Sequence, residues 1–236
     1  MTRTLFVAPQ WIGDAVMTEP LLRELHWRGE QITVAALPWV APVYQHMPSV
    51  SDVIELPFKH GSLQWAERRA LARQWRGLFD RAYVAPNSFK SALLPWLAGI
   101  PERIGYHGES RYGVLTKRIP NPDPRKKPPM VDFYLGLAGS FSRDEGAMRP
   151  VLHRSTEKVR ESLQAFGLQA GRYTVIAPGA EYGPAKMWPP QHVSTLCQLI
   201  GTRWCFWLRP RSRRCVHPLH KWRRKQTFKI WRAKPI

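Results

Sequence analysis

The sequence predicts an α/β protein in which a parallel, doubly wound sheet is followed by the beginning of a second domain of the same kind. Between residues 4 and 106, short apolar runs alternate with longer segments of helical spacing. This alternation is typical of parallel strands joined by crossover helices. A second apolar run at residues 173–177 ends in a proline, as the first run does, and predicts the first strand of a second domain.

The first strand is predicted at residues 4–8, an unbroken apolar run closed by Pro9. Such a run indicates a strand that is buried on both faces. A helix follows at residues 15–27, with Pro20 near its first turn. The remaining elements of the first domain continue the alternation, with strands at 32–37, 53–56, 82–85 and 103–106 and helices at 40–46, 62–75 and 88–97.

The second half of the chain has fewer recognisable elements. Residues 121–129 hold four prolines and three basic residues and predict an exposed loop. Helices are predicted at 156–166 and 191–200, on either side of the strand at 173–177. We therefore expect an N-terminal Rossmann-like domain at 1–155, a linker helix and the start of a second domain at 156–200, and a basic tail at 201–236.

The formal charge of +19 is concentrated at the C-terminus. Residues 201–236 hold 12 of the 36 basic residues and no acid, which leaves 24 basic against 17 acidic residues in the rest. The charge of the first 200 residues alone therefore gives no reason to expect a nucleic-acid partner. The three cysteines have no CxxC spacing, and no signal peptide or 18-residue apolar run is present, so we expect a cytoplasmic protein.

The tail at 201–236 follows neither a helical nor a strand period, and we expect no regular element in it. One interpretation is an arginine- and tryptophan-rich arm that binds nucleic acid or an anionic membrane. The other is a reading-frame shift, because codons for Trp204-Cys-Phe-Trp207 read one base later encode a Gly-Val-Phe-Gly-like string. We favour the frame shift, which sequencing of the coding DNA tests.

Three segments are candidates for chemistry. Gly13-Asp14 follows the first strand, where glycine permits a tight turn and a carboxylate can act as a general base, or where Asp14 simply caps the next helix. Residues 87–90, with Asn87, Ser88 and Lys90, open a helix beyond another strand, where Lys90 can meet an anion and Ser88 can cap the helix.

The third segment is a glycine-bearing loop at 177–189 that contains Gly179, Ala180 and Lys186. Backbone amides, a helix N-terminus and a lysine suit a diphosphate, although a plain connecting turn with a solvated Lys186 has the same spacing. The loop lacks the GxxxxGK[ST] pattern, so ATP hydrolysis is not indicated.

Taken together, these segments resemble the heptosyltransferase II family, inverting GT-B glycosyltransferases of lipopolysaccharide core assembly. The motifs are WIGD at 11–14, RAYVAPNSFKSA at 81–92, GIPERIG at 99–105, GESRYG at 108–113 and PGAEYGPAK at 178–186 followed by Trp188-Pro189. The resemblance covers residues 1 to about 200, and it implies two Rossmann-like domains, the first for the acceptor and the second for the nucleotide sugar.

The resemblance also implies roles for the candidate residues. Asp14 would be the general base, Gly13, Asn87, Ser88 and Lys90 would bind the acceptor, and Gly179, Ala180 and Lys186 would bind the donor ADP-heptose. The acceptor would be heptosyl-Kdo2-lipid A at the inner face of the cytoplasmic membrane, with no metal, no cofactor and no nucleic acid involved. The family's later donor-site motifs do not follow residue 200, so we expect this chain to be inactive by itself.

Overall fold

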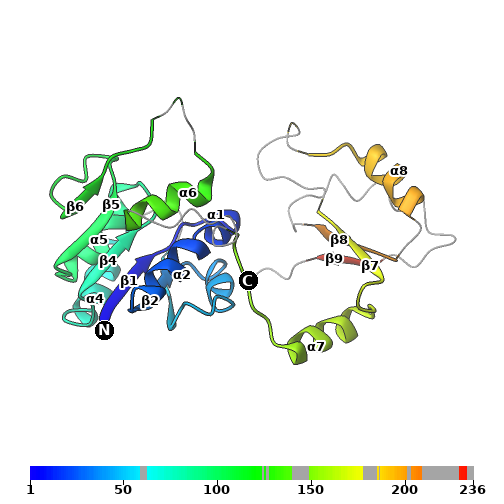
Figure 1. Cartoon of the computed structure of the whole chain (residues 1–236), viewed down its shortest axis with the longest axis horizontal. Helices are drawn as coiled ribbons and strands as arrows, with labels where there is room; N and C mark the ends of the chain where they lie inside the picture. The colour runs from blue at the N-terminus through cyan, green and yellow to red at the C-terminus, as the bar shows by residue number, and fades with distance from the viewer. Residues whose placement is uncertain are drawn as a thin grey trace. The chain divides into compact units, whose positions relative to one another are not determined.

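A computed structural model describes residues 1–58, 63–123, 125, 128–139, 149–177, 185 and 187–200, and the backbone of 203–208 and 229–232. The chain divides into two compact units, Met1–His153 and Arg154–Ile236, shown with all their elements in Figure 1. They are called the first and the second unit below.

The first unit is built on a six-stranded sheet in which every neighbouring pair of strands is parallel. The strand order is β3-β2-β1-β4-β5-β6, so the sheet grows outward in both directions from β1 and β4. This order confirms the predicted doubly wound fold, and ligands of such sheets bind where the order reverses. The strands are β1 Thr2–Val7, β2 Glu30–Ala36, β3 Asp52–Glu55, β4 Arg81–Val84, β5 Glu102–Tyr106 and β6 Lys117–Ile119.

The connecting helices include two where one was predicted. The helix expected at 15–27 is divided at Thr18 into α1 and α2. Pro20 explains the break, because it lacks the N–H group that would extend the hydrogen bonding of α1. The helices are α1 Ile12–Met17, α2 Glu19–Trp27, α3 Ala41–Tyr44, α4 Trp65–Gln74, α5 Phe89–Leu97, α6 Met130–Leu135 and the 3₁₀ helix η1 Gly136–Ala138.

Two hydrophobic cores cover the two faces of this sheet. Phe6 and Val34 belong to one core, together with residues of α2, α3 and α6. Leu5 and Val7, which point the other way from β1, belong to the second core with residues of α4 and α5. Figure 1 shows the sheet between these helices. Burial on both faces explains why the central strands appear in the sequence as unbroken apolar runs.

The second unit contains a parallel three-stranded sheet in the order β7-β8-β9. Its elements are α7 Thr156–Phe166, β7 Tyr173–Ile176, α8 Pro190–Ile200, β8 Arg203–Leu208 and β9 Lys229–Arg232. The expectation of no regular element beyond residue 200 was therefore wrong. The run Trp204-Cys-Phe-Trp207 is rich in residues that favour strands, and a strand in a parallel sheet need not alternate in polarity.

Within the parts of the chain that the structure describes, none of the helices has the length and apolar character required to cross a membrane.

Candidate functional site

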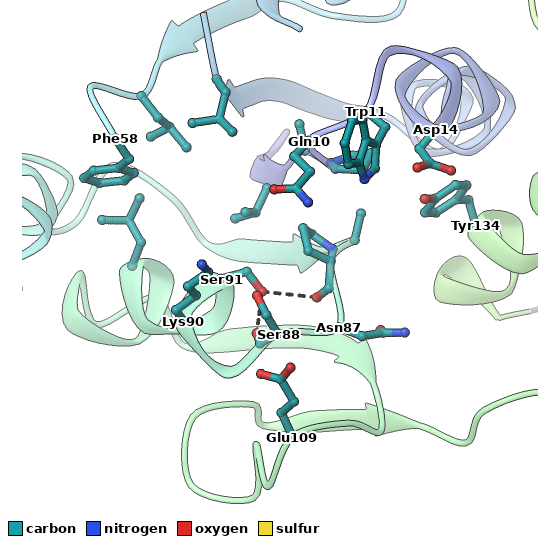
Figure 2. A pocket seen from close by; sticks show the side chains of 18 of the residues that line it. Gln10, Trp11, Asp14, Phe58, Asn87, Ser88, Lys90, Ser91, Glu109 and Tyr134 are labelled. Atoms are coloured by element: carbon teal, nitrogen blue, oxygen red, sulfur yellow. Dashed lines mark hydrogen bonds between the residues drawn. The ribbon is translucent and has the colours of Figure 1, made fainter. Parts of the chain in front are cut away.

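A pocket of about 610 Å³ lies where the parallel strands of the first unit end. Its walls include residues that follow β1, β2, β3 and β4, and side chains from α1, α4, α5 and α6. Figure 2 shows the polar groups that line it. The pocket thus occupies the crevice beside β1 and β4, where the strand order reverses.

Asp14 lines this pocket from the first turn of α1. The N-cap position of that helix is held by Trp11, so the interpretation of Asp14 as the capping residue was wrong. The Asp14 side chain faces the ring of Tyr134, which comes from α6 (Figure 2). Because Asp14 lines the pocket and does not cap the helix, its carboxylate is available to a ligand there.

Partial burial raises the pKa of Asp14 above its ordinary value, and a hydrogen bond from the Tyr134 side chain lowers it in part. Burial also raises the pKa of Tyr134 well above its usual range, so its hydroxyl stays protonated and donates. A carboxylate with a raised pKa accepts a proton more readily than an exposed one. Asp14 is thus suited to act as a general base.

Buried hydroxyl groups form hydrogen bonds at the C-terminal end of helix α1. The Tyr44 hydroxyl lies 3.2 Å from Thr18 Oγ1, and Thr18 Oγ1 donates to the Ala15 carbonyl at 2.7 Å. Tyr44, Thr18 and Ala15 are all fully buried. These contacts fix the turn of helix that carries Asp14.

The residues predicted after β4 join Asp14 in the same pocket. Asn87, Ser88 and Lys90 all line it. Ser88 occupies the N-cap position of α5, as predicted, but its side chain makes no capping hydrogen bond. Instead, Glu109 Oε2 accepts a hydrogen bond from the Phe89 amide at 2.8 Å. The Ser88 hydroxyl is therefore not used to cap the helix.

A buried arginine from the GESRYG motif holds the segment that follows β4. Arg111 is 2% exposed, and its Nη1 donates to the Pro86 carbonyl at 2.8 Å. Its Nη2 donates to Asn87 Oδ1 at 3.3 Å and to the Tyr106 carbonyl. The motif therefore orients the polar segment that forms one wall of the pocket.

Gly13 lies inside helix α1, not in a tight turn. It has no positive φ, and a Cβ atom added there would meet nothing within 4 Å. The tight-turn interpretation was wrong because the helix begins earlier than predicted. Gly13 is also not among the residues that line the pocket. The predicted donor residues Gly179, Ala180 and Lys186 lie outside the described residues.

The sequence analysis named only some of the residues that line the pocket, and it did not include Phe58, Arg68 and Tyr134. Arg68 belongs to a helix that holds three arginines and a glutamate among its ten residues, so it appeared to be one more surface cation. Tyr134 follows the proline-rich loop in a helix of six residues, too short for a periodic signal. The position of Tyr134 next to Asp14 arises only through the tertiary fold.

Comparisons with known proteins agree with this fold. The family described as Glycosyltransferase family 9 (heptosyltransferase) matches residues 68–209. Lipopolysaccharide heptosyltransferase 2 of Escherichia coli K12 is 40% identical over 84% of the chain, and lipooligosaccharide heptosyltransferase 2 of Haemophilus influenzae is 35% identical over the same share. The chain spans 60% of the length of these curated relatives.

Solved structures show the same likeness. That of E. coli ADP-heptose LPS heptosyltransferase II aligns with a TM-score of 0.79 and 33% identity, over 92% of this chain and 67% of that one. A family 9 glycosyltransferase from Veillonella parvula, 18% identical over 98% of this chain and 69% of that one, aligns with a TM-score of 0.77 and shares the fold. The comparisons give no support to a nucleic-acid or membrane arm, and the family match extends into the strand β8.

Proposed function

Because the chain belongs to glycosyltransferase family 9, we propose that it takes part in transferring L-glycero-D-manno-heptose from ADP-heptose to the heptose of the lipopolysaccharide inner core. The observation that supports this most directly is a partly buried Asp14 in a pocket at the strand-order reversal. Two relatives that are 40% identical to the chain are named lipopolysaccharide heptosyltransferase 2. The first unit would bind the acceptor and the second unit the nucleotide sugar.

In the proposed reaction, Asp14 accepts the proton of an acceptor hydroxyl as its oxygen attacks the anomeric carbon of the donor heptose. A new glycosidic bond forms while the bond from the anomeric carbon to the phosphate oxygen breaks. ADP leaves with the electron pair of that bond, and the anomeric configuration inverts. General-base catalysis of this kind contributes about 10² to 10⁴ in rate.

The other polar residues of the pocket would orient the acceptor. Asn87, Ser88 and Lys90 surround the same space as Asp14, so they can hydrogen-bond sugar hydroxyls or meet an anionic group. Gly13 remains a predicted contact, and Gly179, Ala180 and Lys186 remain the predicted diphosphate site. The proposed acceptor is a lipid, so we expect the reaction to take place at the inner face of the cytoplasmic membrane.

A chimera tests the proposed acceptor role of the first unit. Residues 1–153 of this chain would replace the matching part of E. coli lipopolysaccharide heptosyltransferase 2, and ADP release would be measured with ADP-heptose and heptosyl-Kdo2-lipid A. The proposal predicts transfer that depends on the lipid acceptor. A chimera that is folded and binds ADP-heptose, yet transfers no heptose, would contradict it.

A further inference from the structure

The pocket wall contains a buried arginine with no acidic partner among the described residues. Arg68, on α4, is 7% exposed and lines the pocket. Its Nε donates to the Leu63 carbonyl at 2.7 Å, and its Nη1 donates to the Lys90 carbonyl at 3.2 Å. Its guanidinium carbon lies 4.1 Å from the centre of the Phe58 ring. Arg68 is therefore held rigidly in one orientation.

The positive charge of Arg68 is not neutralised within the described part of the first unit. Burial lowers the pKa of Arg68, and no nearby carboxylate opposes this effect. Arg81 provides the contrast, because it pairs with Glu30 at 2.8 Å and with Glu102 at 2.6 Å. A buried charge is costly unless it is paired. Two carbonyl groups satisfy N–H donors of Arg68 but do not cancel its charge.

Lys90 adds a second cation to the same pocket. It lies in the first turn of α5, lines the pocket, and is connected to Arg68 through its own carbonyl. Glu109 also lines the pocket, but its Oε2 accepts from the Phe89 amide. Figure 2 shows Lys90 and Phe58 on the side of the pocket away from Asp14. The pocket therefore has two cations, Arg68 and Lys90, at one end, and the Asp14 carboxylate lies away from them.

We propose that Arg68 and Lys90 form a subsite for an oxyanion, a phosphate or carboxylate group that the acceptor carries away from the hydroxyl that Asp14 deprotonates. That the acceptor supplies this oxyanion rests on the proposed function, whereas the oxyanion subsite itself does not. A guanidinium presents N–H donors in a planar fork that suits either anion, and an ammonium group adds a point charge. An acceptor bound in this way has its uncharged hydroxyl directed toward Asp14.

Binding of matched sugars to the full chain tests the subsite. Glucose 6-phosphate, glucuronate and glucose differ in the anion they carry, and their affinities can be measured by NMR titration. We expect both charged sugars to bind roughly ten- to a hundredfold more tightly than glucose, as charge-assisted hydrogen bonds would produce. The stronger of the two charged probes indicates whether phosphate or carboxylate is the preferred group.

Substitutions in the pocket test whether it causes the preference for charged sugars. Arg68→Gln should reduce it to about threefold or less, whereas Arg69→Gln, an exposed neighbour on the same helix, should leave it unchanged. Lys90→Gln should lower the preference for charged sugars severalfold without changing a buried side chain. This variant therefore tests the subsite even if Arg68→Gln does not fold. Equal binding of charged and neutral sugars to the unaltered chain would overturn the proposal, as would a preference that survives both Arg68→Gln and Lys90→Gln.

The subsite and the proposed function can fail separately. Asp14→Asn should slow transfer by the chimera about 10²- to 10⁴-fold and leave the preference for charged sugars intact. A charge preference that depends on Arg68 in a chimera that transfers no heptose would contradict only the proposed function. Transfer to the lipid acceptor that is unaffected by Arg68→Gln would contradict only the use of this subsite by the acceptor.

Discussion

The Tyr134 side chain lies against the Asp14 carboxylate and lowers its pKa, although the two residues lie on the helices α6 and α1. Figure 2 shows the two side chains facing one another at one side of the pocket. The proton affinity of the candidate base is thus set by two opposing influences, burial that raises its pKa and Tyr134 that lowers it.

Replacing Tyr134 with phenylalanine should raise the pKa of Asp14 further, because the donor that stabilises the carboxylate is lost while the ring remains. The active base is the ionised form, so the acidic limb of a transfer profile should move to higher pH. NMR titration of the Asp14 carboxyl group in the full chain measures the shift directly. Tyr112→Phe, at a residue that is 64% exposed, is the control and should have no effect. A lower pKa in Tyr134→Phe would contradict the assignment.

Asp14→Asn should stabilise the protein at neutral pH. The pKa of Asp14 is raised in the folded state, so the folded chain holds this proton more tightly than the unfolded chain does. Stability must then decrease as the pH rises from the unfolded pKa, about 3.9, through the folded one. The melting temperature of Asp14→Asn should exceed that of the unaltered chain at pH 7, and the difference should shrink toward about pH 4. A lower melting temperature at pH 7 would argue against a desolvated carboxylate.

Glu19 forms a hydrogen bond with the C-terminal segment of the first unit, at Val151. Its side chain is buried, Oε2 accepts from the Val151 amide at 3.0 Å, and Oε1 lies 3.6 Å from Arg23 Nε. Glu19→Ala removes the carboxylate that accepts from the Val151 amide and should cost about 1.5 kcal/mol of unfolding free energy, as for a hydrogen bond to a charged group. Faster hydrogen exchange at Val151 should accompany the loss.

Glu24→Ala is the matched control for Glu19 on the same helix. Glu24 forms a surface pair with Arg28 at 2.7 Å, which contributes only about 0.3–0.5 kcal/mol. Equal losses from the two substitutions in urea denaturation would show that Glu19 does not have the anchoring role described here.

Gly13→Ala should leave the fold intact or stabilise it by up to about 1 kcal/mol, because Gly13 is helical and has space for a methyl group. Gly29→Ala should instead destabilise by about 1–2 kcal/mol, since Gly29 has a φ of 82°. Thermal denaturation of both variants tests this contrast. Weaker acceptor binding by a stable Gly13→Ala variant would support the predicted contact at Gly13, and destabilisation would restore the tight-turn interpretation.

The sheet of the first unit could be predicted from the sequence because its central strands are buried on both faces. Such strands appear as apolar runs, and those of β1, β2 and β4 are unambiguous. The three-residue strand β6 and the helix α6 are too short to give a period. The strands β8 and β9 were missed because a basic, aromatic run hid their pattern.

The site could be predicted only in part, for a related reason. Asp14, Asn87, Ser88 and Lys90 follow strands directly, so the rule for parallel sheets brings them to one edge. Arg68 and Tyr134 lie on helices whose sequences do not reveal which face meets the pocket. Their roles depend on tertiary contacts, with Phe58 in one case and with Asp14 in the other.

The most direct test of Asp14 as general base is the rate of heptose transfer by the chimera with and without Asp14→Asn. A general-base role for Asp14 predicts a decrease in kcat of about 10² to 10⁴ with little change in KM for the acceptor, because the substitution removes the base but not the pocket. Asp52→Asn, at an exposed carboxylate at the start of β3, should leave kcat unchanged. A folded Asp14→Asn chimera that keeps its full kcat would show that Asp14 is not the general base.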